Sequence, residues 1–190
     1  MKFDNFDFVS SFDTVTAVIL GAVLATLGGF VATQLERWTI RRERRVNAAE
    51  IFDELLSSVS LIVEFTRETH GRGDPYGPFT IRLLHSIDRE LAVYDRNRER
   101  LFDISKAELR FRIQNAMTKL SISLDGMYEL TSEINAKSAD KPSGKPDSEK
   151  DDSDLDALRT DRDIAFSTVL EIGEELKLIA DELKTHIKKL

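Results

Sequence analysis

TVTAVILGAVLATLGGFVATQL, Thr14 to Leu35, differs in composition from the rest of this sequence. It runs for 22 residues without a charged side chain, although 32% of the 190 residues in the chain are charged. A helix rising about 1.5 Å per residue would make it roughly 33 Å long, close to the bilayer hydrocarbon core of about 30 Å. The stretch is apolar or small on every side and has no face suited to water. The sequence therefore predicts a transmembrane helix over residues 14–38.

Two other interpretations of this stretch are a buried core helix and a cleaved signal peptide. A helix on the surface of a soluble core keeps one polar face, which is missing here. A signal peptide has a basic leading region, a shorter apolar run and a small-residue cleavage site. The leader MKFDNFDFVSSFD is acidic, and the stretch ends in LERW. We therefore expect residues 1–13 to form an external tail and the span to stay in the mature protein.

The charges that flank the span predict its orientation. Asp4, Asp7 and Asp13 precede it and outweigh Lys2. The arginines that follow it are Arg37, Arg41, Arg42, Arg44 and Arg45. Because loops rich in Lys and Arg stay in the cytoplasm, we expect a single-pass protein of the inner (cell) membrane with its N-terminus outside and its C-terminus in the cytoplasm. We expect the same arginines, together with Trp38, to lie at the lipid headgroups.

Small residues recur every three to four positions along the span and form one ridge. They are Ala17, Gly21, Ala25, Gly28, Gly29 and Ala32. Small side chains let two membrane helices approach closely, which favours a homo-oligomer with this ridge as its helix–helix interface. Gly and Ala are also generally frequent in membrane helices, so a ridge that makes no contact is the alternative.

The chain beyond the span has the apolar spacing of helices. No Pro or Gly occurs from Thr39 to His70, so the span can continue directly into the next helix. Turns are expected near 71–78, where HGRGDPYGP gathers three glycines and two prolines, and near 101–105. The predicted fold class is all-α, with an N-terminal transmembrane helix continuing into a cytosolic antiparallel bundle of about four helices.

The positions expected to face the bundle core form one seam per helix. In residues 39–135 they are Ala48, Phe52, Leu55, Val59, Ile62, Phe65 or Thr66, Leu84, Ile87, Leu91, Tyr94, Leu109, Ile113, Met117, Leu120, Leu124, Met127 and Ile134. In residues 154–190 a coiled-coil or bundle seam is predicted at Leu155, Leu158, Arg162, Ala165, Val169, Ile172, Leu176, Ile179, Leu183, His186 and Leu190. Arg162 needs an acidic partner or an exposed first turn. Ser105 with Glu108 predicts a capping box, and Asp154 a cap for the last helix.

A segment without aromatic or long aliphatic side chains separates the last two helices. Residues 136–153, within AKSADKPSGKPDSEKDDSD, are dense in Lys, Asp, Ser, Gly and Pro. Such a composition cannot bury enough apolar surface to offset its ordering entropy. We expect a disordered linker there.

Three features of the sequence together resemble a known group of proteins. They are the run VYDRNRERLFDISKAELRFRIQNAMTKL, the later run IGEELKLIADEL, and a span ahead of an Arg-rich helix. The sequence resembles uncharacterised bacterial inner-membrane proteins with one N-terminal span and a cytosolic array of helical hairpins. The resemblance implies a location in the bacterial inner membrane and a fold of this kind. It implies no activity.

The sequence offers no constellation expected to do catalysis. It has no Cys, as suits a reducing cytosol, and three His, at positions 70, 85 and 186. The paired Glu-x-x-His motifs of a di-iron bundle do not occur, and neither does the Arg-x(4–6)-His pattern of some helical ribonucleases. Glu182 and His186 share a helix face, but two ligands are too few for a metal site. We expect no enzyme, no metal and no cofactor.

These observations favour a membrane-anchored scaffold or interaction module that self-associates and has an unknown protein partner. From Thr39 onward the chain has 25 basic and 30 acidic side chains, so its net charge of about −5 disfavours nucleic acid. One alternative is an oligomeric membrane-perturbing or pore-forming effector, for example in phage defence. Another is a membrane-tethered hydrolase or nuclease.

Overall fold

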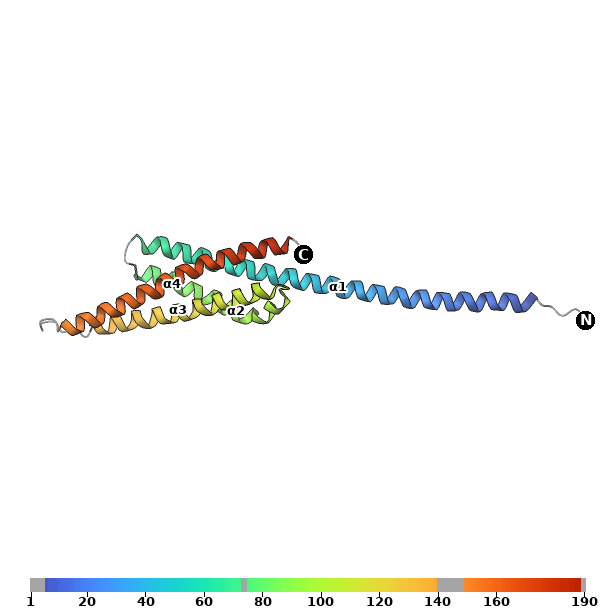
Figure 1. Ribbon diagram of the computed structural model, residues 1–190, viewed down its shortest axis with the longest axis horizontal. Helices are drawn as coiled ribbons and strands as arrows, with labels where there is room; N and C mark the ends of the chain where they lie inside the picture. The colour runs from blue at the N-terminus through green and yellow to red at the C-terminus, as the bar shows by residue number, and fades with distance from the viewer. Residues whose placement is uncertain (1–5, 73–74, 140–148, 189–190) are drawn as a thin grey trace, which may run out of the picture. The chain divides into compact units, whose positions relative to one another are not determined.

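The computed structural model describes residues 6–72, 75–139 and 149–188 (Figure 1). Within these ranges the chain forms four α-helices, one short 3-10 helix and no strand. The helices are α1 (Phe6–His70), α2 (Pro78–Asn97), η1 (Arg98–Asp103), α3 (Ala107–Ala139) and α4 (Glu149–Ile187). The predicted all-α class is confirmed.

The chain divides into two compact units, Met1–Arg44 and Arg45–Leu190. One uninterrupted helix, α1, supplies the described part of the first unit and the start of the second, so the apolar stretch does continue into the next helix. This helix begins at Phe6 and includes residues 6–13, which were expected to form a tail. Residues 6–13 mix Phe and Val with short polar side chains. This segment contains no Pro or Gly that would stop a helix. Residues 1–5 lie outside the described part.

The core of the second unit follows the predicted seams. The buried seam residues are Ala48, Phe52, Leu55, Val59, Thr66, Leu84, Ile87, Tyr94, Leu109, Ile113, Met117, Leu120, Leu124, Met127, Ile134, Leu155, Val169, Ile172, Leu176, Ile179 and Leu183. Ile62, Leu91, Leu158, Arg162, Ala165 and His186 are half-buried. At the position left open between Phe65 and Thr66, Thr66 faces the core and Phe65 is 51% exposed. The Thr66 hydroxyl can occupy the core because it donates to the Ile62 carbonyl at 2.8 Å.

Specific contacts join the second-unit part of α1 to α2 and α4. The ring of Phe52 meets the ring of Tyr94 edge-on at 6.3 Å, which joins α1 to α2. Arg67 pairs with Glu174 of α4 at 2.7 Å. Each contact spans many residues of sequence, so they hold segments together that are far apart in the chain.

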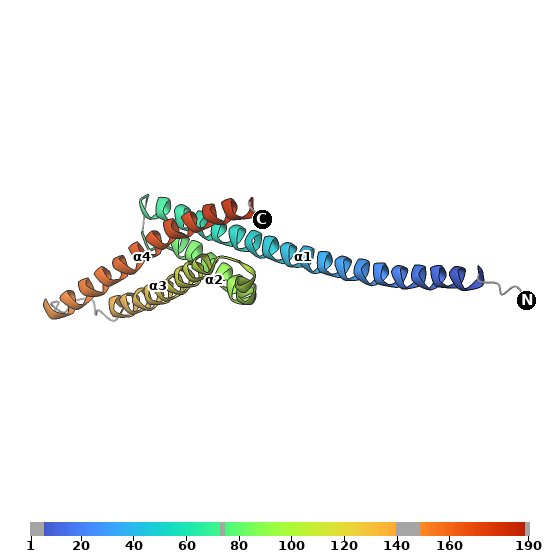
Figure 2. The same ribbon diagram turned by 45° about the vertical axis from the view of Figure 1, so that its right-hand side comes forward.

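The beginning of α3 lies against the end of α4. Arg112 pairs with Glu182 at 2.7 Å, and Lys106 reaches the same carboxylate at 3.3 Å. Burial raises the pKa of Glu182, but the hydrogen bonds from these two cations outweigh it and lower that pKa. Figures 1 and 2 both show α4 running beside α3.

Three predicted local features differ from the structure. Because α3 begins at Ala107, the N-cap position belongs to Lys106 and not to Ser105, whose hydroxyl lies 2.9 Å from Nε2 of His186. Because α4 begins at Glu149, Asp154 lies within the helix and does not cap it. Of the linker predicted over 136–153, residues 140–148 lie outside the described part, and the flanking residues continue α3 and α4.

Candidate functional site

The apolar stretch of α1 is exposed on every side in the part of this helix whose side chains the structure describes. An 18-residue window of this helix has a mean hydropathy of 2.0 and none of it is buried. The large apolar side chains exposed there are Val18, Ile19, Leu20, Val23, Leu24, Leu27, Phe30, Val31, Leu35, Trp38 and Ile40. Within the described residues, this is one helix long and apolar enough to cross a membrane.

The ridge of small residues lies open on this helix. Gly21, Gly28 and Gly29 have no neighbouring atom within 4 Å of where a β-carbon would stand. At about 100° per residue, the ridge from Ala17 to Ala32 occupies an arc of roughly 120°. A second helix could approach the backbone along that arc.

Three threonines in and just after the apolar stretch satisfy their hydroxyl groups within the helix. The hydroxyls of Thr26, Thr33 and Thr39 donate to the carbonyls of Ala22, Gly29 and Leu35, at 2.8, 2.9 and 3.0 Å. Each bond runs back one helical turn. These side chains therefore need no water to complete their hydrogen bonding.

The arginine segment predicted for lipid headgroups is exposed. Arg37, Arg41, Arg42 and Arg44 belong to the first unit, and Arg45 is the first residue of the second. Trp38 is 60% exposed, and the guanidinium of Arg42 lies 5.6 Å from its ring centre, a cation–π contact. The structure thus joins the aromatic and basic members of the predicted headgroup set.

A cluster of rings and charges that the sequence did not indicate lies where the turn after α1 meets α4. The guanidinium of Arg162 lies 3.4 Å from the ring centre of Tyr76, and the Tyr76 hydroxyl donates to Asp163. His70 stacks on Phe166 at 4.2 Å. Burial and the bond to Asp163 raise the pKa of Tyr76. Arg162 therefore has an aromatic partner in place of the two arrangements expected for it.

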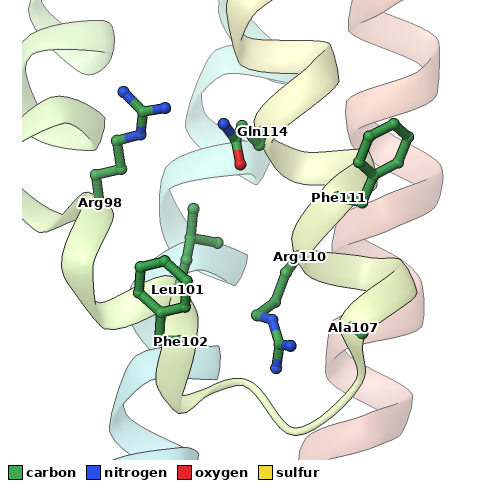
Figure 3. A pocket seen from close by; sticks show the side chains of 7 residues that line it. All are labelled: Arg98, Leu101, Phe102, Ala107, Arg110, Phe111 and Gln114. Carbon is green, nitrogen blue, oxygen red and sulfur yellow. The ribbon is translucent and has the colours of Figure 1, made fainter.

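A second arrangement that the sequence missed is a groove of about 270 Å³ between η1 and the start of α3 (Figure 3). Its lining residues are Arg98, Leu101, Phe102, Ala107, Arg110, Phe111 and Gln114. Phe102 is 80% and Phe111 70% exposed. Nη1 of Arg110 donates to the carbonyl of Ile104 at 2.6 Å, which ties the loop between η1 and α3 to α3. An exposed Phe in a turn has no periodicity signal, so the pattern of the sequence could not single it out.

The histidines and carboxylates of the described residues do not gather in groups of three or more that could hold a metal. His85 stacks on Tyr128 at 4.6 Å and lies 3.0 Å from Asp88. Glu182 and His186, the pair singled out in the sequence, contact basic side chains and Ser105 respectively.

Comparison of the chain with protein-family models, curated proteins and solved structures gives no match.

Proposed function

We propose that this protein is a single-pass protein of the inner (cell) membrane that displays a helical scaffold in the cytoplasm. The observation that carries the proposal is the all-round exposure of the apolar stretch of α1. A protein partner would cover one face of such a helix and leave the others in water, whereas a bilayer covers every face. The headgroup anchors are Trp38 and the arginines from Arg37 to Arg45.

The anchor is tested by washing membranes that contain the full-length protein with alkaline carbonate, which strips peripheral proteins. The protein is expected to stay in the membrane pellet. The double variant Leu20→Arg, Leu24→Arg should leave the pellet, since each charge costs about 2.5–3.5 kcal/mol at the centre of a span. Extraction of the unchanged protein would contradict the anchor.

The cytoplasmic part is proposed to be an antiparallel bundle of about four helices with a scaffolding role. The ion pairs Arg67–Glu174 and Asp53–Lys184 support this arrangement, because the later residue of α1 meets the earlier residue of α4. Arg112, near the start of α3, pairs with Glu182, near the end of α4. Its acidic net charge favours protein partners over nucleic acid.

Spin labels at Asn47 and Lys188, both exposed, test the bundle in the full-length protein. The antiparallel arrangement predicts a short separation, since Lys184, one turn before Lys188, reaches Asp53 at 3.7 Å. Labels at Asn47 and Glu68 give a reference distance along α1, the ruler, because 21 helical residues span about 32 Å. An Asn47–Lys188 separation as long as the ruler would reject the arrangement.

Self-association through the small-residue ridge is part of the proposal. The double variant Gly21→Ile, Gly29→Ile places bulk on the ridge and should lower the oligomer fraction in bilayers. Val23→Ile with Leu27→Ile is the matched control, because these positions lie on the opposite side of the helix. Equal effects of both pairs, or a monomeric unchanged protein, would reject the ridge as an interface.

The hydroxyl groups of the threonines in the apolar stretch favour the scaffold over a pore-forming effector. A water-filled pore needs polar groups directed at its lumen. Thr26 and Thr33 direct their hydroxyls at their own backbone, at 2.8 and 2.9 Å. The scaffold is therefore the function we propose.

A further inference from the structure

The second unit begins at Arg45, and an exposed aromatic and basic surface lies at that end of the unit. Nη1 of Arg100 donates to Oδ1 of Asn47 at 3.3 Å, which places η1 beside the beginning of this unit. Ser105, just after η1, lies 2.9 Å from His186, so the end of α4 is at the same place. Figures 1 and 2 show the α2–α3 connection and the end of α4 at one end of the second unit.

Phe102 is the feature of this end that needs an explanation. It is 80% exposed, the highest value among the large apolar side chains from residue 16 onward whose exposure the structure describes. It borders the groove between η1 and α3, and Arg98 lies on the same side of that groove (Figure 3). Arg98 and Arg100 precede it in the sequence by four and two residues, and both are exposed. An aromatic ring with neighbouring guanidinium groups is the composition that proteins place at a membrane interface.

The chain itself limits how far this surface can be from a membrane that α1 spans. Asn47 follows Arg44 by three residues, so even a fully extended chain would keep the two within about 11 Å. Arg44 belongs to the segment proposed to meet the headgroups. Because Arg100 contacts Asn47, η1 lies beside the residues that directly follow the proposed headgroup segment.

The charge of this surface is mixed. The basic side chains from residue 95 to residue 110 are Arg96, Arg98, Arg100, Lys106 and Arg110, and the acidic ones are Asp95, Glu99, Asp103 and Glu108. Net charge alone would attract anionic lipid only weakly. Contact must therefore come from Phe102 together with the two arginines next to it in η1.

We propose that Phe102, together with Arg98 and Arg100 of the same 3-10 helix, docks the second unit onto the anionic surface of the bilayer that α1 crosses. The ring lies at the boundary between headgroups and acyl chains, and the guanidinium groups donate to lipid phosphates. This inference rests on the proposed function, because it needs the anchor. It adds a second attachment that fixes the orientation of the scaffold on the membrane.

The test uses the full-length protein in nanodiscs that contain anionic lipid and lipids with a quencher near the headgroup. Trp38 is the one tryptophan of the chain, so Phe102→Trp in a Trp38→Phe background gives a single probe at η1. Its fluorescence should be quenched as strongly as that of Trp38 in the unchanged protein. Phe79→Trp in the same background is the control, because Phe79 is 63% exposed at the other end of α2 and should stay unquenched.

The outcomes separate the two proposals. Quenching at position 102 that is lost with Arg98→Gln and Arg100→Gln, but kept with Arg82→Gln and Arg89→Gln, supports the docking. Quenching of Trp38 without quenching at position 102 overturns the docking and leaves the anchor standing. Absence of quenching at Trp38 overturns the anchor and, with it, the docking. Equal quenching at positions 79 and 102 also overturns the docking, since the bundle would then lie on the membrane without using η1.

Discussion

Gly173 of α4 lies directly against the side chain of Val63 of α1. A β-carbon added to Gly173 would overlap Cγ1 of Val63 and stand 2.9 Å from its Cβ. We therefore expect Gly173→Ala to destabilise the second unit by about 1–3 kcal/mol through overpacking. Thermal unfolding of the full-length protein in mild detergent, followed by circular dichroism, measures this.

Gly126→Ala is the matched control for the contact between α1 and α4. Gly126 is also helical but has no atom within 4 Å of its β-carbon position, so Ala should stabilise the protein by up to about 1 kcal/mol. Combining Gly173→Ala with Val63→Ala should recover part of the loss, because the overlapping methyl group is removed. A Gly173→Ala variant as stable as Gly126→Ala would show that the two helices are not this close.

The ring of Tyr76 covers the guanidinium of Arg162 at 3.4 Å. Tyr76→Phe keeps the ring, loses the hydrogen bond to Asp163 and should cost about 1 kcal/mol. Tyr76→Leu also removes the cation–π contact, which should add about 0.5–2 kcal/mol. Both are measured by thermal unfolding. In an Arg162→Leu background the stability gap between the two Tyr76 variants should shrink to what the ring contacts with His70 and Phe166 contribute; an unchanged gap would disprove the cation–π contribution.

The carboxylate of Asp53 should destabilise the folded state at neutral pH. Burial raises its pKa above the ordinary value of 3.8, and Lys184, at 3.7 Å, lowers it less than burial raises it. A raised folded-state pKa means that stability is lost as pH rises through the interval above 3.8. Asp53→Asn should therefore be more stable than the unchanged protein at pH 7, by up to about 1 kcal/mol.

The pH dependence of that difference is the diagnostic measurement. Below the ordinary pKa of Asp both proteins carry a neutral group at position 53, so the gain should disappear in acid. Glu174 and Glu182, whose pKa values are lowered by their cationic partners, titrate in both proteins and cancel in the comparison. A variant less stable than the unchanged protein at pH 7 would mean that the pair with Lys184 outweighs burial.

Much of the helical architecture could be predicted because helix packing is periodic. Leu109, Ile113 and Leu120 repeat at the spacing of one helix face, and the structure buries all three. The continuity of α1 followed from the absence of Pro and Gly between Thr39 and His70. These are local properties of the chain, so the sequence records them directly.

The features that the sequence did not reveal depend on partners far away in the chain. Arg162 is matched by Tyr76, and Ser105 contacts His186 instead of capping α3. The exposure of Phe102 depends on how η1 sits against α3, which no repeat encodes. Helix ends were also missed, as at Phe6 and Glu149, because charged and polar residues can extend a helix beyond its apolar seam.

The topology of α1 decides whether this protein spans the membrane once with its second unit in the cytoplasm. Because the chain has no Cys, single cysteines at Asn5 and at Lys177, which is exposed, can be labelled with a membrane-impermeant maleimide in intact cells. We expect labelling at Asn5 from outside, and labelling at Lys177 only after the cells are permeabilised. Labelling of Lys177→Cys in intact cells would contradict the cytoplasmic scaffold, and labelling of neither site until permeabilisation would contradict the span.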